Sequence, residues 1–180
     1  MQENLYVKLA REAILSAYEH RPIDYDSYLH ADPSLGEQGA AFVTLNSHGH
    51  LRGCIGSIIA HRPLIEDIVH NARSAAFHDP RFNPLEKSEY PDLDVEVSIL
   101  TPPRMVDYRD TDELRHIIRP GIDGVIIRQG HYQATFLPQV WDELNDFESF
   151  FAHLGLKAGI GRDPLAYHPE VYTYQVQKYV

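Results

Sequence analysis

Hydrophobic positions along the chain follow the period of helices in some stretches and the period of strands in others. Apolar residues spaced four apart predict an amphipathic helix over residues 3–20. A second helix is expected to begin at Pro63, because a proline suits a first turn and an apolar face then runs to Ala76. Further helices are expected over residues 111–118, from Pro138, and over 146–158.

The strand-like stretches indicate hairpins. Residues 47–50 (SHGH) and the pair Gln129-Gly130 each separate two such stretches, as turn residues do. Because strands joined by tight turns pair antiparallel, we predict an α+β fold with a mainly antiparallel sheet flanked by helices. Residues 21–39, rich in Pro, Asp, Ser and Gly, predict an irregular but ordered crossing segment. The expected strands are residues 40–46, 51–56, 93–100, 125–128, 132–137 and 171–176.

Composition and charge narrow the functional classes. The chain has 180 residues, a length that fits one domain, and a formal net charge of -10. Such an acidic chain argues against a general nucleic-acid or anionic-membrane binder, although one cluster of arginines could form a local basic patch. No apolar run approaches the length of a membrane span, and a single cysteine fits a reducing compartment, so we expect a cytoplasmic protein. The cluster consists of Arg52, Arg62, Arg73 and Arg81.

Residues 51–56 (LRGCIG) carry the most distinctive local chemistry. The sole cysteine, Cys54, lies between two glycines and two positions after Arg52. Strand alternation would place both side chains on one face, where a guanidinium would favour the thiolate. The alternative is a small buried cysteine in a glycine-rich core strand. Residues alone leave both interpretations open.

The same hexapeptide resembles the signature of the AMME-syndrome candidate protein family, whose prokaryotic members are called AmmeMemoRadiSam system protein A. Further segments resemble the family in the same order, so that the similarity covers about residues 5–178. An ordered set of segments is far more specific than any single motif. These segments are residues 75–82 (AAFHDPRF), 84–85 (PL), 95–100 (VEVSIL), 121–125 (GIDGV), 136–141 (FLPQVW) and 157–159 (KAG).

The resemblance implies an organisation and a pathway rather than a reaction. It implies one AMME-type domain over residues 1–180, built of a large and a small lobe, with the signature near the cleft between them. Prokaryotic members of the family occur alongside, or fused with, a Memo-like protein and a radical SAM protein. We therefore expect these two proteins as partners, and we consider a small-molecule ligand as well.

Three further residues are candidates for a site with Arg52 and Cys54. Asp79 and Arg81 follow a predicted helix end, where they could bind a polar ligand or form a structural salt bridge. Glu96 lies between Val95 and Val97 of a predicted strand and faces either a solvated sheet face or the same cleft. The sequence predicts that Glu96 or the Asp79–Arg81 loop approaches Cys54.

Catalytic and cofactor motifs are weak in this chain. A nucleophilic Cys54 would want a histidine base, and His48, His50 and His78 are the best placed along the sequence. Neither a phosphate-binding glycine loop nor a Cys-x-x-Cys pair occurs, so we predict no cofactor and no metal.

Three functions remain open at this stage. We predict that the signature forms a ligand- or partner-binding site in which Cys54 is not a nucleophile. The alternatives are an enzyme that uses Cys54 on a small polar metabolite and a nucleic-acid-associated housekeeping factor. Whether the chain is an enzyme is left undecided by the residues.

Overall fold

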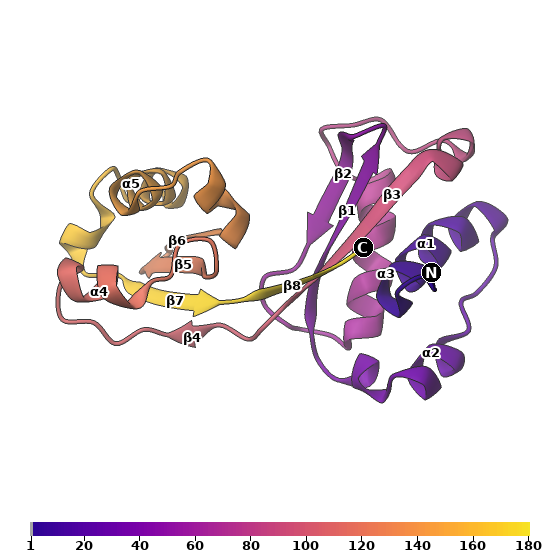
Figure 1. Cartoon of the computed structure of the whole chain (residues 1–180), viewed down its shortest axis with the longest axis horizontal. Helices are drawn as coiled ribbons and strands as arrows, with labels where there is room; N and C mark the ends of the chain where they lie inside the picture. The colour runs from indigo at the N-terminus through magenta and orange to yellow at the C-terminus, as the bar shows by residue number, and fades with distance from the viewer. Residues whose placement is uncertain (1) are drawn as a thin grey trace. The chain divides into compact units, whose positions relative to one another are not determined.

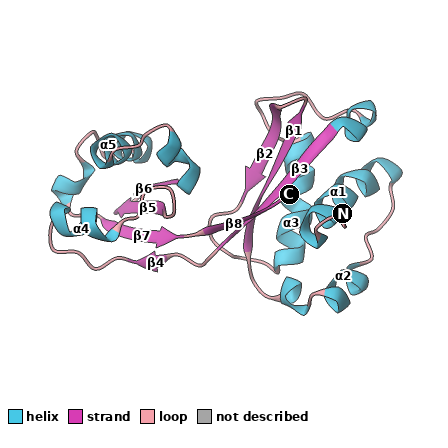
Figure 2. Ribbon diagram, viewed as in Figure 1, coloured by secondary structure: helices cyan, strands magenta, loops and turns pink. Residues whose placement is uncertain are grey.

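The computed structural model describes residues 2–180, which form two compact units. One unit contains the chain up to Leu100 together with Gln177–Val180, and the other contains Thr101–Val176. Each unit holds one four-stranded sheet with helices packed on it, and the hairpin pairs are antiparallel (Figures 1 and 2). The α+β class predicted from the strand pattern is therefore confirmed. The cleft expected between two lobes stays a prediction.

The first sheet has the strand order β2-β1-β3-β8, so that β2 is an edge strand. Helix α1 begins after Asn4, whose side chain accepts the Tyr6 N–H at 2.9 Å. The elements of this unit are α1 (Leu5–Glu19), α2 (Tyr25–Ala31), the 3-10 helix η1 (Pro33–Gly36), β1 (Ala40–Ser47), β2 (His50–Gly56), α3 (Leu64–Phe77), the 3-10 helix η2 (Lys87–Asp92), β3 (Leu93–Leu100) and β8 (Val176–Tyr179).

Alternation along the strands divides this sheet into a buried and a half-exposed face. Val43 and Leu45 of β1, with Val97 of β3, are fully buried in a core that α1 and α3 complete. Thr44, which lies between Val43 and Leu45, and Glu96, which directly precedes Val97, point to the opposite face and remain partly exposed. The hydrophobic pattern thus fixes which face is left for function.

The second sheet has the order β4-β7-β5-β6, and α5 packs on β5 and β6. Its core includes Trp141, whose ring stacks on Phe150 with 3.6 Å between centroids. Helix α5 ends at Gly159, which adopts a φ of 82° that favours glycine. The elements are β4 (Arg104–Met105), α4 (Thr111–Ile117), β5 (Gly124–Gln129), β6 (Tyr132–Phe136), the 3-10 helix η3 (Pro138–Asp142), α5 (Phe147–Ala158), the 3-10 helix η4 (Pro164–Tyr167) and β7 (Glu170–Tyr174).

Two expectations about local structure were wrong. The segment 21–39 is not irregular throughout, because Asp24 caps α2 by accepting the Ser27 N–H and Asp32 caps η1 through Ser34. The single strand expected over residues 171–176 is two strands, β7 and β8, that belong to different sheets. Short capped helices and a strand that changes sheet carry little periodic signal, so the hydrophobic pattern does not resolve them.

Candidate functional site

The signature forms most of β2, and Cys54 lies on the half-exposed face of its sheet. Cys54 pairs with Thr44 of β1, and Thr44 pairs with Glu96 of β3, so the three residues form one row across the strands. The Thr44 hydroxyl and the Cys54 sulfur are 3.3 Å apart and share a hydrogen bond. Cys54 is a free thiol of intermediate burial. It is therefore neither packed in the core nor fully open to solvent.

A β-bulge breaks the alternation that placed Arg52 beside Cys54. Gly53 pairs with Leu45, but the next pair along β1 joins Asn46 to Leu51, so Arg52 is the extra residue of β2. A bulge redirects the side chain it inserts. The expectation that simple alternation runs from Arg52 to Cys54 is therefore wrong at this position.

The side chain of Arg52 is held by groups that the sequence analysis did not name. Its Nε donates to Glu89 at 2.8 Å and its Nη2 to the same carboxylate at 3.1 Å. A third bond joins Nη2 to the Asn83 carbonyl at 2.9 Å. The bond to Glu89 raises the pKa of Arg52, and the bond from Arg52 lowers the pKa of Glu89. A structural ion pair therefore occupies much of the guanidinium that was predicted to bind a ligand.

Asp79 and Arg81 together hold the free edge of β2 at Cys54. The Cys54 N–H donates to Asp79 at 3.0 Å, and Arg81 Nη2 donates to the Cys54 carbonyl at 3.3 Å. Arg81 also donates to Asp79 at 2.7 Å, and this bond holds the pKa of the buried Asp79 carboxyl well below its usual range. The pair supplies the donor and the acceptor that a neighbouring strand would supply, and thereby covers an exposed sheet edge.

Close packing explains why two positions of the signature are glycine. A Cβ on Gly53 would lie 2.1 Å from the Ala75 carbonyl oxygen of α3, and one on Gly56 would lie 2.1 Å from the Phe42 ring. Gly53 therefore allows the helix to approach the strand, while Gly56 makes room for an aromatic ring on the Cys54 face.

Glu96 shares the face of Cys54 but lies two strands away. Neighbouring strands are about 4.8 Å apart, so the backbones of Cys54 and Glu96 are separated by about 10 Å. The Glu96 carboxylate forms an ion pair with Lys178 of β8 at 3.1 Å. The structure thus brings Asp79 and Arg81 to Cys54 through the backbone and leaves Glu96 at the far end of the row.

The histidines considered as bases have other surroundings. His48 is on an exposed turn, with its Nε2 3.9 Å from Asp92 Oδ2. His50 is the exposed first residue of β2, and His78 is the C-cap of α3. Within residues 2–180, the hydrogen bond found for the Cys54 sulfur is the one to Thr44. No group of three histidine, cysteine or acidic side chains in that range is arranged to hold a metal ion. Nor does that range include a helix both long and apolar enough to cross a bilayer.

Sequence reasoning missed Glu89 and Thr44. Glu86 and Glu89 form a reciprocal capping box at the start of η2, which marks the start of a helix but does not indicate that Glu89 pairs with Arg52. Thr44 could be placed opposite Cys54 only once the register of the hairpin was known, and the bulge alters that register.

Comparisons with known proteins agree with the motif resemblance. A protein of Methanothermobacter thermautotrophicus is 41% identical over 142 residues, which cover 78% of this chain and 73% of that protein. A protein of Saccharolobus islandicus is 38% identical over 167 residues, covering 87% and 71%. The crystal structure of an uncharacterized protein, PH0010 of Pyrococcus horikoshii, matches with a TM-score of 0.83 and 33% identity over 99% of this chain and 92% of that one. The AMMECR1 family model matches residues 7–179, so this chain belongs to the AMMECR1 family.

Proposed function

We propose that the chain is a binding protein and that a partner protein docks on the sheet face that carries Cys54. The observation that carries this proposal is that most groups of the signature already have partners within the chain, while the Cys54 thiol stays partly accessible on one face of the sheet. Its arginine is engaged by Glu89, its strand edge by Asp79 and Arg81, and its glycines by close packing, whereas the Cys54 thiol remains on a half-exposed face beside Thr44.

The composition of this face suits a protein partner. Phe42 supplies an aromatic ring, Leu51 is 42% exposed, and Glu96 with Lys178 adds an ion pair two strands from Cys54. Interfaces between proteins that also exist separately combine apolar groups with a polar rim in this way. A sheet face offers a broad surface, whereas small-molecule sites are typically concave.

We propose the Memo-like protein of the same genome as this partner, because the family resemblance associates the two, and the radical SAM protein as a further member of the assembly. A cytosolic setting is part of the proposal, since the sole cysteine is a free thiol. Catalysis by Cys54 receives less support, because the only hydrogen bond described for its sulfur within residues 2–180 is shared with a hydroxyl rather than with a base.

Alkylation of the sole cysteine provides the test. Iodoacetamide labelling of the folded chain is followed by mass spectrometry, alone and with the purified Memo-like protein. We expect the partner to slow labelling at least about tenfold at saturation, and Glu96→Lys to weaken this protection by placing a cation next to Lys178. Arg104→Ala, a change at an exposed position in the other unit, should leave the protection intact.

Three results would overturn the proposal. Unchanged labelling in the presence of the folded partner would show that the partner does not dock on the Cys54 face. Protection by a metabolite extract from which protein has been removed would instead indicate a small-molecule site. Labelling much faster than that of a free thiol peptide would indicate an activated nucleophile and favour the enzyme.

A further inference from the structure

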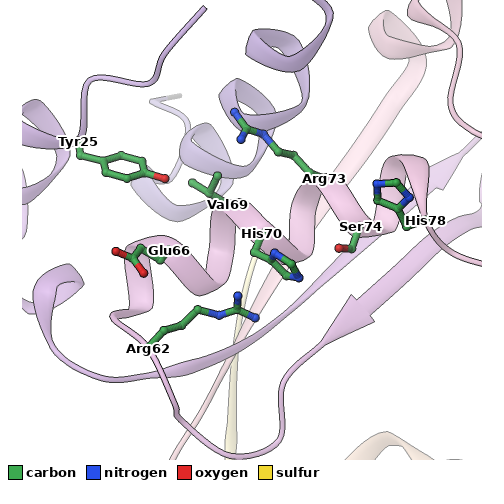
Figure 3. A pocket seen from close by; sticks show the side chains of 8 residues that line it. All are labelled: Tyr25, Arg62, Glu66, Val69, His70, Arg73, Ser74 and His78. Atoms are coloured by element: carbon green, nitrogen blue, oxygen red, sulfur yellow. The ribbon is translucent and has the colours of Figure 1, made fainter. Parts of the chain in front are cut away.

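The outer side of α3 carries a second candidate site, separate from the signature. A pocket of about 480 Å³ lies along this side, a volume within the usual range for small-ligand sites. Helical spacing places Glu66, His70 and Ser74 on one stripe of α3, with Arg73 beside them. Figure 3 shows Arg62 on one side of His70 and Arg73 on the other.

The two arginines of this pocket differ in their partners. The Nε of Arg62 donates to Asp67 at 2.7 Å, and Asp67 is fully buried. Arg73 donates instead to the Ala13 carbonyl at 3.0 Å and to the Ser16 hydroxyl at 3.1 Å. Both partners of Arg73 are neutral, so within residues 2–180 no carboxylate contact offsets its charge. The α1 groups therefore fix a guanidinium in place without neutralising it.

Donors remain on both arginines. A guanidinium carries five N–H groups, and the hydrogen bonds described above use one of Arg62 and two of Arg73. His70, which is exposed, and Ser74 add further hydrogen-bonding groups to the same stripe. Because the side chains of the arginines are already held, a ligand would bind them at a small cost in conformational entropy.

Tyr25 and Glu66 also line the pocket. Burial raises the pKa of the half-buried Tyr25, while the charge of Arg73 acts to lower it and that of Glu66 to raise it. All three groups line the same pocket. The tyrosine ring offers an aromatic surface next to the cationic centre. Glu66 adds a negative charge that a bound anion would have to tolerate.

We propose that this pocket binds a small organic phosphate, with its phosphate group between Arg62 and Arg73 beside His70 and its organic part along Tyr25. Planar guanidinium groups match the oxygen geometry of phosphate and form charge-assisted hydrogen bonds with it. The proposal concerns a different surface from the Cys54 face, so it stands or falls independently of partner docking there.

Isothermal titration of the full chain with inorganic phosphate, ribose 5-phosphate and ribose tests this site. We expect ribose 5-phosphate to bind with a Kd of about 1 mM or below, ribose not to bind, and added salt to weaken the interaction. Tighter binding of ribose 5-phosphate than of phosphate supports an organic phosphate. Equal binding of the two would overturn the assignment of the organic part and leave an inorganic anion site.

Two variants separate binding from folding. Arg73→Gln should weaken binding of ribose 5-phosphate about tenfold or more, since a charge-assisted bond is lost. That variant also loses contacts to α1, so Glu66→Gln provides the complementary test: removing the nearby negative charge should tighten binding about two- to threefold, which unfolding cannot imitate. Arg104→Ala should change nothing. Absence of binding up to about 10 mM, or affinities that neither pocket variant alters, would overturn the proposal.

Discussion

The signature strand and the outer side of α3 both concentrate arginines, but they use them differently. At the signature, Arg52 forms an ion pair with Glu89 and Arg81 forms one with Asp79, so a carboxylate of the same chain balances each positive charge. On the outer side of α3, Arg62 is also paired with a carboxylate, that of Asp67, but Arg73 donates to a carbonyl and a hydroxyl. A distinctive motif therefore need not coincide with the surface whose charges are left for a ligand. The partners of each charge, rather than its place in a motif, decide what it can bind.

The largest effect should follow Gly53→Ala. The added Cβ would lie 2.1 Å from the Ala75 carbonyl oxygen, which is backbone and cannot rotate away, so α3 must shift from the sheet. We expect a loss of about 3 kcal/mol in the free energy of unfolding, measured by urea denaturation. Gly36→Ala is the matched control, because its new Cβ would find Leu29 at an ordinary 3.4 Å. Equal stability of the two variants would contradict a packing role for the signature glycine.

Asp79→Asn should cost about 2 kcal/mol, because it weakens the bonds from Arg81 and from the Cys54 N–H to a buried side chain. The pKa of Asp79 is lower in the folded chain than its ordinary 3.8. Its contribution is therefore fully present above about pH 4 and is lost as the pH falls toward the folded pKa. Unfolding curves from pH 7 to pH 2 should show a shallower acid-induced loss in the variant. An unchanged slope would mean that Asp79 carries no such linkage.

A double-mutant cycle measures the pair of Arg52 and Glu89. Arg52→Gln and Glu89→Gln should each destabilise the chain, with a coupling free energy of about 1 kcal/mol, since the contact is bidentate but partly exposed. Both changes are read from chemical denaturation. A coupling near zero would leave Arg52 available for a ligand and would weaken the contrast with α3.

The smallest effect should follow Cys54→Ala. The thiol is half-exposed and its described hydrogen bond is to Thr44, so we expect a loss of less than about 1 kcal/mol by urea denaturation. Thr44→Val offers a comparison, because it removes the hydroxyl but keeps the side-chain shape. A cost for Cys54→Ala as large as that for Gly53→Ala would indicate that the cysteine is a core residue.

Periodicity predicted most of the fold but little of the site. The hairpin of β1 and β2 and the stop of α5 at Gly159 follow from turn residues and local spacing, which act over a few positions. The bulge at Arg52 and its contact with Glu89 depend on the register of one strand and on a short helix 37 positions away. Long-range pairing of charges leaves no local signal. Asp79 and Arg81 do contact Cys54, although through its backbone rather than its thiol.

One measurement compares the two regions directly. The Nε–H signals of Arg52, Arg62, Arg73 and Arg81 can be followed by ¹H–¹⁵N NMR while ribose 5-phosphate is added, with assignments from single Arg→Lys variants. We predict that the signals of Arg73 and Arg62, which both line the pocket, shift together with one saturating affinity. Those of Arg52 and Arg81, which lie outside the pocket and are paired with Glu89 and Asp79, should stay in place. Shifts concentrated on Arg52 and Arg81 would contradict it and return the ligand site to the signature.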